Sequence, residues 1–208
     1  MKSMFPAVLV VLILSGIVAA DPVTLFSQPI DPGAGPIISD VENTRRLTDF
    51  TLPAGGIVTD VCWWGLYPGF DGTSLGPTQF LIGFFDEFDF DTPPVYQTTV
   101  FAVPQATAYQ SNVADQGPFP VYRYESAIAP TFSVPAGQQM WISIAESDPR
   151  TTHIGYSQWA WSHAIGDTTD YAVVLKGEAV PLPGAAVIGL LGLGTASAAL
   201  RRRRALTK

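Results

Sequence analysis

The sequence predicts an all-β fold, a two-sheet antiparallel β-sandwich or jelly roll, and three observations lead to it. Short apolar stretches alternate with clusters of Pro, Gly, Asp and Thr along the central part of the 208-residue chain. No central stretch of ten or more residues repeats its apolar side chains with the 3.6-residue period of an amphipathic helix. Several stretches instead alternate with period two, as at Phe80, Ile82 and Phe84. Such alternation turns one face of each strand toward a core.

Ten strands are predicted within about 160 residues, which suits two packed sheets. They are Val23 to Gln28, Arg46 to Leu52, Ile57 to Tyr67, Thr78 to Asp86, Val95 to Val103, Val121 to Ala127, Thr131 to Val134, Gln139 to Glu146, Ile154 to Ser162 and Tyr171 to Glu178.

One six-residue motif occurs twice at the end of a predicted strand. Phe50 to Gly55 reads FTLPAG, and in the second half of the chain Phe132 to Gly137 reads FSVPAG. Proline fixes φ and glycine permits a chain reversal, so we expect one turn type at two equivalent corners. Internal duplication and independent use of the same turn chemistry both explain the motif.

The N-terminal segment 1–20 has the composition of an export signal. Lys2 precedes an apolar run over residues 7–14, and small residues end the segment at Ala20. This order predicts a helical signal peptide over residues 1–20, cleaved by signal peptidase after Ala20. An uncleaved membrane anchor is the alternative, although the apolar residues 5–20 are shorter than the roughly 20 residues of a spanning helix.

The C-terminal residues 180–208 have three parts in a fixed order. The apolar segment 184–200 would form a helix of about 25 Å, close to the thickness of a bilayer core. The basic end 201–208 favours the cytoplasmic side, which places the predicted domain 21–179 outside the inner membrane. The residues of the spacer and the basic cluster are Val180, Pro181, Leu182, Pro183, Arg201, Arg202, Arg203 and Arg204.

This proline-flanked spacer, short apolar helix and arginine cluster resemble the PEP-CTERM sorting signal. The resemblance implies processing by an exosortase in exopolysaccharide-producing Gram-negative bacteria, with Leu182 standing where the family usually has Glu. An ordinary single-pass tail anchor is the alternative. The segments Thr48 to Pro53, Ile57 to Gly65 and Phe80 to Asp86, and those around Phe132 to Ile144, also resemble β-sandwich ectodomains that precede such tails. That second resemblance implies a fold and a surface location but no reaction.

Removal of the two ends would make the protein strongly acidic. The ends hold 6 of the 11 basic residues and none of the 18 acidic ones, which leaves a net charge of −13. A surface of this charge repels phosphate backbones and excludes nucleic acid as a partner, whereas it favours divalent cations.

Closely spaced carboxylates form a candidate Ca²⁺ site at Asp86, Glu87, Asp89 and Asp91, interleaved with Phe88. Ca²⁺ accepts six to eight oxygen ligands with loose geometry. The stretch lacks the Asp-x-Asp-x-Asp-Gly pattern of a dedicated calcium loop, so a solvated acidic loop is the alternative. No other cofactor is predicted.

Aromatic residues suggest a sugar-binding face. Trp159 and Trp161 share one face of a predicted strand, and two flat rings suit the apolar face of a sugar. Core filling is the alternative for them, as for Trp141. Adjacent Trp63 and Trp64 are predicted to face opposite sides of their strand.

The residues for catalysis are few. His153 and His163 are the only histidines, their spacing fits no metal motif, and no Gly-x-Ser-x-Gly elbow is present. The single cysteine, Cys62, lies in an apolar strand without a neighbouring basic residue, which predicts a buried side chain and not a reactive thiol.

We therefore expect a non-enzymatic exported protein of the cell surface or extracellular matrix that associates with exopolysaccharide. A Ca²⁺-dependent carbohydrate-binding or adhesion module and a secreted hydrolase are the alternatives.

Overall fold

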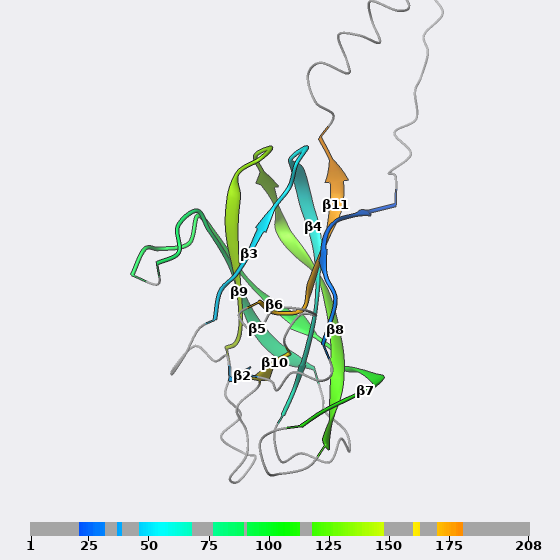
Figure 1. The fold of residues 1–208 in the computed structure, drawn as a ribbon. Coiled ribbons are helices and arrows are strands. Elements are labelled where there is room, and N and C mark those ends of the chain that lie inside the picture. Colours follow the sequence, from blue (N-terminus) through cyan, green and yellow to red (C-terminus); the bar gives the residue numbers. More distant parts are fainter. Residues whose placement is uncertain are drawn as a thin grey trace, which may run out of the picture.

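The computed structural model describes residues 21–31, 37–38, 46–67, 77–89, 91–112, 118–147, 160–162 and 170–180. All regular structure in these residues is β, as predicted (Figure 1). The strands are β1 (Val23–Gln28), β2 (Ile37–Ile38), β3 (Thr48–Thr51), β4 (Gly56–Leu66), β5 (Thr78–Phe85), β6 (Tyr96–Ala102), β7 (Gln105–Asn112), β8 (Pro118–Val134), β9 (Gln139–Glu146), β10 (Ala160–Trp161) and β11 (Val173–Ala179).

The strands form two antiparallel sheets. In the seven-stranded large sheet the order is β1-β11-β4-β10-β2, with β8 along the opposite edge of β4 and β7 beyond β8. The four-stranded small sheet has the order β3-β9-β5-β6. Segments far apart in sequence therefore lie side by side in both sheets.

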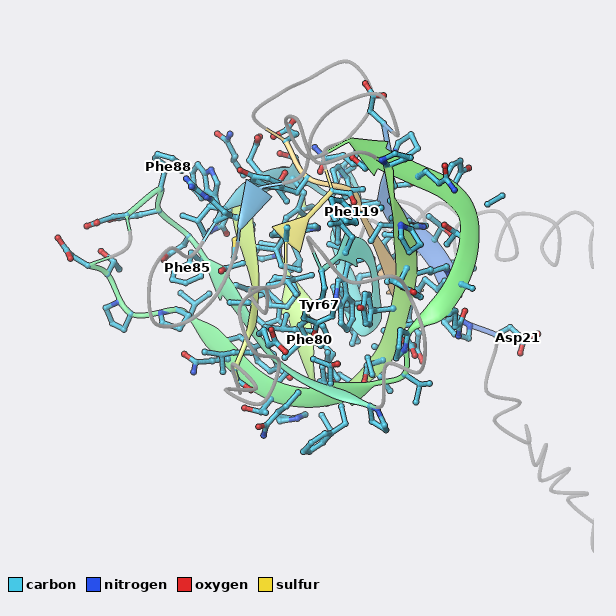
Figure 2. All side chains as sticks on the ribbon, turned by 90° about the horizontal axis from the view of Figure 1, so that it is seen from below. Asp21, Tyr67, Phe80, Phe85, Phe88 and Phe119 are labelled. Carbon is cyan, nitrogen blue, oxygen red and sulfur yellow. The ribbon has the colours of Figure 1, made fainter. Side chains whose placement is uncertain are left out.

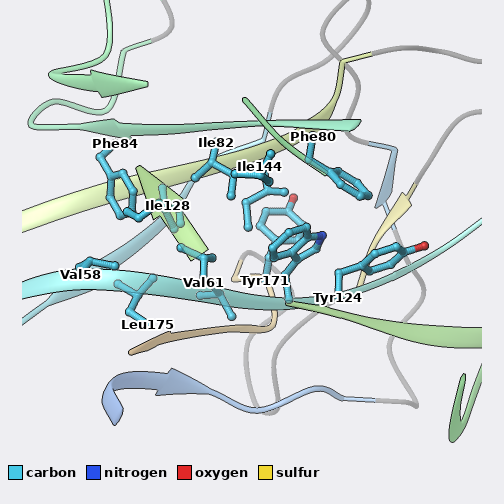
Figure 3. Close-up of a cluster of buried hydrophobic side chains, with 14 of the residues drawn as sticks. Val58, Val61, Phe80, Ile82, Phe84, Tyr124, Ile128, Ile144, Tyr171 and Leu175 are labelled. Carbon is cyan, nitrogen blue, oxygen red and sulfur yellow. The ribbon is translucent and has the colours of Figure 1, made fainter. Parts of the chain in front are cut away.

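The two sheets share one core, which is consistent with the predicted β-sandwich. Trp63 of the large sheet meets Phe80 of the small sheet edge to face, with ring centroids 5.1 Å apart. Figure 3 shows Phe80, Ile82 and Phe84 facing the large sheet. All three are fully buried, which confirms the alternation predicted for this strand. Such aromatic contacts add to the free energy gained by burying apolar surface.

A bulge in β4 resets the alternation of that strand. The pairing of β4 shifts between Val58 and Asp60 against both of its neighbours. Val58 and Val61, three residues apart, therefore both face the core. Beyond the bulge Trp63 enters the core, while Trp64 packs on a smaller cluster around Leu66. The prediction that Trp63 and Trp64 face opposite sides is confirmed.

Strand β8 runs unbroken where two strands were predicted. The chain continues as a single strand across Pro130. The side chain of Tyr96 donates a hydrogen bond to the carbonyl oxygen of Pro130, and the hydroxyl of Thr98 donates to that of Ala129 at 3.2 Å. These contacts join β8 to β6 across one side of the sandwich.

The ends of the described domain lie together. Val23 pairs with Gly177, and Ala179 pairs with Gly56. Asp21 and Val180 are therefore at the end of the sandwich that carries the β3–β4 and β8–β9 turns (Figure 1). We call this the terminal end, and the opposite end, where β4 stops and β5 begins, the distal end.

Among the described residues, no helix is long and apolar enough to span a bilayer. The signal peptide predicted at residues 1–20 and the sorting tail from residue 181 onward lie outside the described part of the chain. Val180, the first spacer residue, is described and exposed.

Candidate functional site

The outer face of the small sheet carries an exposed phenylalanine beside a partly buried tryptophan, a pair that we call the aromatic patch. Phe88 lies in the connection between β5 and β6, and 68% of its surface is exposed. Its ring centroid is 6.3 Å from that of Trp141 on β9, at an interplanar angle of 54°. Figure 2 shows Phe88 at the margin of the molecule, outside Phe85. The two rings come from segments that are far apart in the sequence.

Strand alternation explains why Trp141 faces outward. Its neighbours Met140 and Ile142 are buried in the core, so Trp141 points to the opposite face and is half-buried. Trp141 pairs with Phe85 of β5 on one side and with Asp49 of β3 on the other. Phe85, Trp141 and Asp49 therefore lie in one row across the outer face of the small sheet.

A small hollow lies beside the aromatic patch. It has a volume of about 10 Å³, roughly the space for one water molecule. Its lining residues are Leu81, Gly83, Phe85, Gln97, Ser143 and Ala145. A hollow of this size does not hold a sugar, so a larger ligand would rest on the exposed rings.

The carboxylates of Asp86, Glu87, Asp89 and Asp91 are all exposed in the same connection. The carboxylate of Asp89 accepts hydrogen bonds from the N–H of Asp91 at 2.9 Å and from the hydroxyl of Thr92 at 3.1 Å. Asp89 thus stabilises its own turn. Within the part of the chain that the structure describes, no three His, Cys, Asp or Glu side chains are grouped closely enough to hold a metal ion. The Ca²⁺ site predicted at Asp86, Glu87, Asp89 and Asp91 stays a prediction.

Trp161 does not belong to an exposed surface. It is fully buried, its ring stacks on Tyr171 with centroids 4.8 Å apart, and its Nε1 donates a hydrogen bond to the carbonyl oxygen of Ala172 at 3.0 Å. Because β10 pairs with β4 in the large sheet, the inward face of β10 is part of the core. Trp161 is therefore not accessible to a sugar. The prediction that it shares an exposed sugar-binding face with Trp159 is wrong for Trp161. Trp159, His153 and His163 lie outside the described residues.

A buried carboxylate marks the distal end. Glu146 is 1% exposed, and its Oε1 accepts a hydrogen bond from the Tyr67 hydroxyl at 2.9 Å. Burial, followed by the negative charge of Glu146, raises the pKa of Tyr67 well above its usual range. Tyr67 therefore remains protonated and donates this hydrogen bond to Glu146. This pair ties the end of β4 to the end of β9.

Cys62 is buried, as predicted, but its surroundings are not those the sequence suggested. Burial raises the pKa of its thiol to about 11. Glu125 on β8 pairs directly with Cys62 in the strand register and forms ion pairs with Arg123 and with Lys176 of β11. Basic side chains are thus close to the thiol in space although none is close in sequence, and burial still keeps the thiol protonated.

The aromatic patch is not among the sites predicted from the sequence. In the sequence, Phe88 belongs to an acidic stretch and Trp141 is one of several tryptophans. The alternation around Trp141 was a usable signal, because it places that ring on the face opposite the core. Comparisons with protein-family models, curated proteins and solved structures found no match.

Proposed function

We propose that this protein is a non-enzymatic exported protein of the cell surface or extracellular matrix. In this proposal a helical signal peptide over residues 1–20 delivers the sandwich, and a PEP-CTERM-like tail over residues 180–208 holds it in the inner membrane until an exosortase-like enzyme releases it. The supporting observation is that Asp21 and Val180 leave the sandwich at the same end. Both segments that would meet the membrane therefore start from one side of the domain.

The short spacer limits the distance between the domain and the membrane. Four residues, 180–183, separate the last strand residue, Ala179, from the apolar segment. Fully extended, they span at most about 14 Å. The terminal end would thus lie close to the bilayer while the tail is intact, and the distal end would face away from it.

The aromatic patch supports association with exopolysaccharide. An exposed ring next to a second ring offers an apolar surface to the carbon-bound hydrogens of a sugar, and such burial holds a ligand without chemistry. Two buried ionisable groups in the described part of the chain also suit a non-enzymatic role. Glu146 is hydrogen-bonded to Tyr67, and the thiol of Cys62 is protonated.

Mass spectrometry of the protein released by the native cell tests the processing steps. We expect Asp21 as the first residue and a last residue near Pro183. An Ala20→Arg variant should keep its leader, because signal peptidase requires a small residue before the cleaved bond. Recovery of an intact Arg201 to Arg204 cluster outside the cell would contradict release through the tail.

A further inference from the structure

Two phenylalanines on the small-sheet side of the molecule are equally exposed but differ in their neighbours. Phe88 and Phe101 each expose 68% of their surface. Phe88 lies next to the ring of Trp141, whereas Phe101 pairs with Gln79 at the far end of β6. Phe88 and the accessible part of Trp141 form a larger continuous apolar surface than Phe101 does alone, and such surfaces mark binding sites.

Among the described residues, the charged side chains next to the aromatic patch in sequence or in strand register are acidic. Asp86 and Glu87 directly precede Phe88, and Asp49 pairs with Trp141 on β3. The described basic side chains are elsewhere, because Arg123 and Lys176 lie on the large sheet, ion-paired with Glu125. The remaining described one, Arg46, lies close enough to Tyr171 to interact with it electrostatically. A ligand on the rings would therefore have carboxylates as its nearest described charged groups.

The aromatic rings together with the neighbouring carboxylates favour a positively charged ligand. We propose that the aromatic patch binds a polysaccharide that carries free amino groups. Sugar rings would rest on Phe88 and Trp141, and the ammonium groups would lie near the carboxylates of Asp86 and Glu87 and the π-faces of the rings. An acidic polysaccharide is repelled by the same carboxylates. The inference rests on the proposed association with polysaccharide and adds the chemical class of the sugar.

Retention on polysaccharide beads tests the inference with the full chain in the form that the cell exports. Partly deacetylated chitosan supplies amino groups, chitin supplies the same backbone without them, and alginate supplies carboxylates. We expect retention on chitosan that weakens as salt is added.

Phe88→Ala and Trp141→Ala should each lower retention on chitosan at least tenfold, while Phe101→Ala, at a site as exposed as Phe88, should leave it unchanged. Phe88→Ala decides the result if Trp141→Ala impairs folding.

A charge-matched pair of variants separates a site from general attraction. Asp86→Asn with Glu87→Gln removes two carboxylates beside the aromatic patch, and Asp21→Asn with Glu178→Gln removes two exposed carboxylates at the terminal end. We expect a severalfold loss of retention in the first variant only. Equal losses in both variants would show that charge alone holds the protein on chitosan and would overturn the site.

The remaining outcomes distinguish this inference from the proposed function. Equal retention on chitin and chitosan, lost in Phe88→Ala, would overturn the charge class but support polysaccharide association. Retention that Phe88→Ala leaves unchanged would overturn the site. No retention on any polysaccharide would overturn both binding proposals, while the masses of the released protein would still decide the export proposal.

Discussion

The main-chain N–H of Gly137 donates a hydrogen bond of 2.9 Å to the carbonyl oxygen of Leu52, which lies in the other copy of the repeated turn motif. The same oxygen accepts the N–H of Gly55 at 3.1 Å. The two turns meet because β3 pairs with β9 and β4 pairs with β8. Both glycines have a positive φ, 69° and 70°, as one turn chemistry predicts. The hydrogen bonds differ, since Gly55 closes its own turn and Gly137 bonds to its neighbour.

This arrangement predicts unequal effects of alanine at the two glycines. Alanine at φ near +70° costs roughly 1–2 kcal/mol at either position. A Cβ at Gly55 would also lie 2.9 Å from the backbone N of Ala136 and O of Val134, whereas a Cβ at Gly137 would meet nothing within 4 Å. We expect Gly137→Ala to lower the free energy of unfolding by about 1 kcal/mol and Gly55→Ala by about 3 kcal/mol. Denaturant unfolding measures both, and equal losses would contradict the contact between the turns.

Burial of Trp161 predicts a large stability loss on truncation. Trp161→Ala would leave a cavity beside Tyr171 and remove the hydrogen bond to Ala172, at a cost of about 3–5 kcal/mol. Trp64→Ala is the matched control, because Trp64 is only partly buried and should cost less. A loss below about 1 kcal/mol for Trp161→Ala would mean that this ring is not a core residue.

The raised pKa of Cys62 predicts an unreactive thiol. With a pKa of about 11, about 0.1% of the folded molecules carry a thiolate at pH 8. Ellman's reagent should therefore label the protein only after denaturant is added. The thiol of Cys62 ionises at a lower pH in the unfolded chain than in the folded protein. Its ionisation therefore lowers the free energy of unfolding as the pH rises from about 9 to about 11. Cys62→Ala should remove that part of the pH dependence, and rapid labelling of the native protein would contradict the burial of the thiol.

The acidic β5–β6 connection predicts no stabilisation by Ca²⁺. A cation bound only to the folded state would raise the melting temperature, but both carboxylate oxygens of Asp89 already accept hydrogen bonds from their own turn. We expect the same melting temperature in millimolar Ca²⁺ and in chelator. A rise with Ca²⁺ that Asp86→Asn and Glu87→Gln abolish would instead support the calcium-dependent alternative.

Local chemistry in the sequence determined the strands that are buried on one face. Period-two alternation predicted β5 and β9, and β9 has the predicted bounds, Gln139–Glu146. The same kind of signal placed Trp63 and Trp64 on opposite faces, and the Pro-Ala-Gly motif marked two turns. Each of these features depends on residues adjacent in the chain, which is why it can be read without the fold.

Only the tertiary structure decided which segments became neighbours. Strand β7, Gln105–Asn112, lacks an apolar alternation and is a strand because it pairs with the edge of β8. The two residues of β10 are held by β4 and β2, and that pairing buries Trp161. Likewise, Phe88 lies beside Trp141, and Arg123 lies close enough to interact with Cys62, because strands that are distant in the sequence pair with one another. Burial and proximity of this kind depend on strand register across the sheets, which no local pattern encodes.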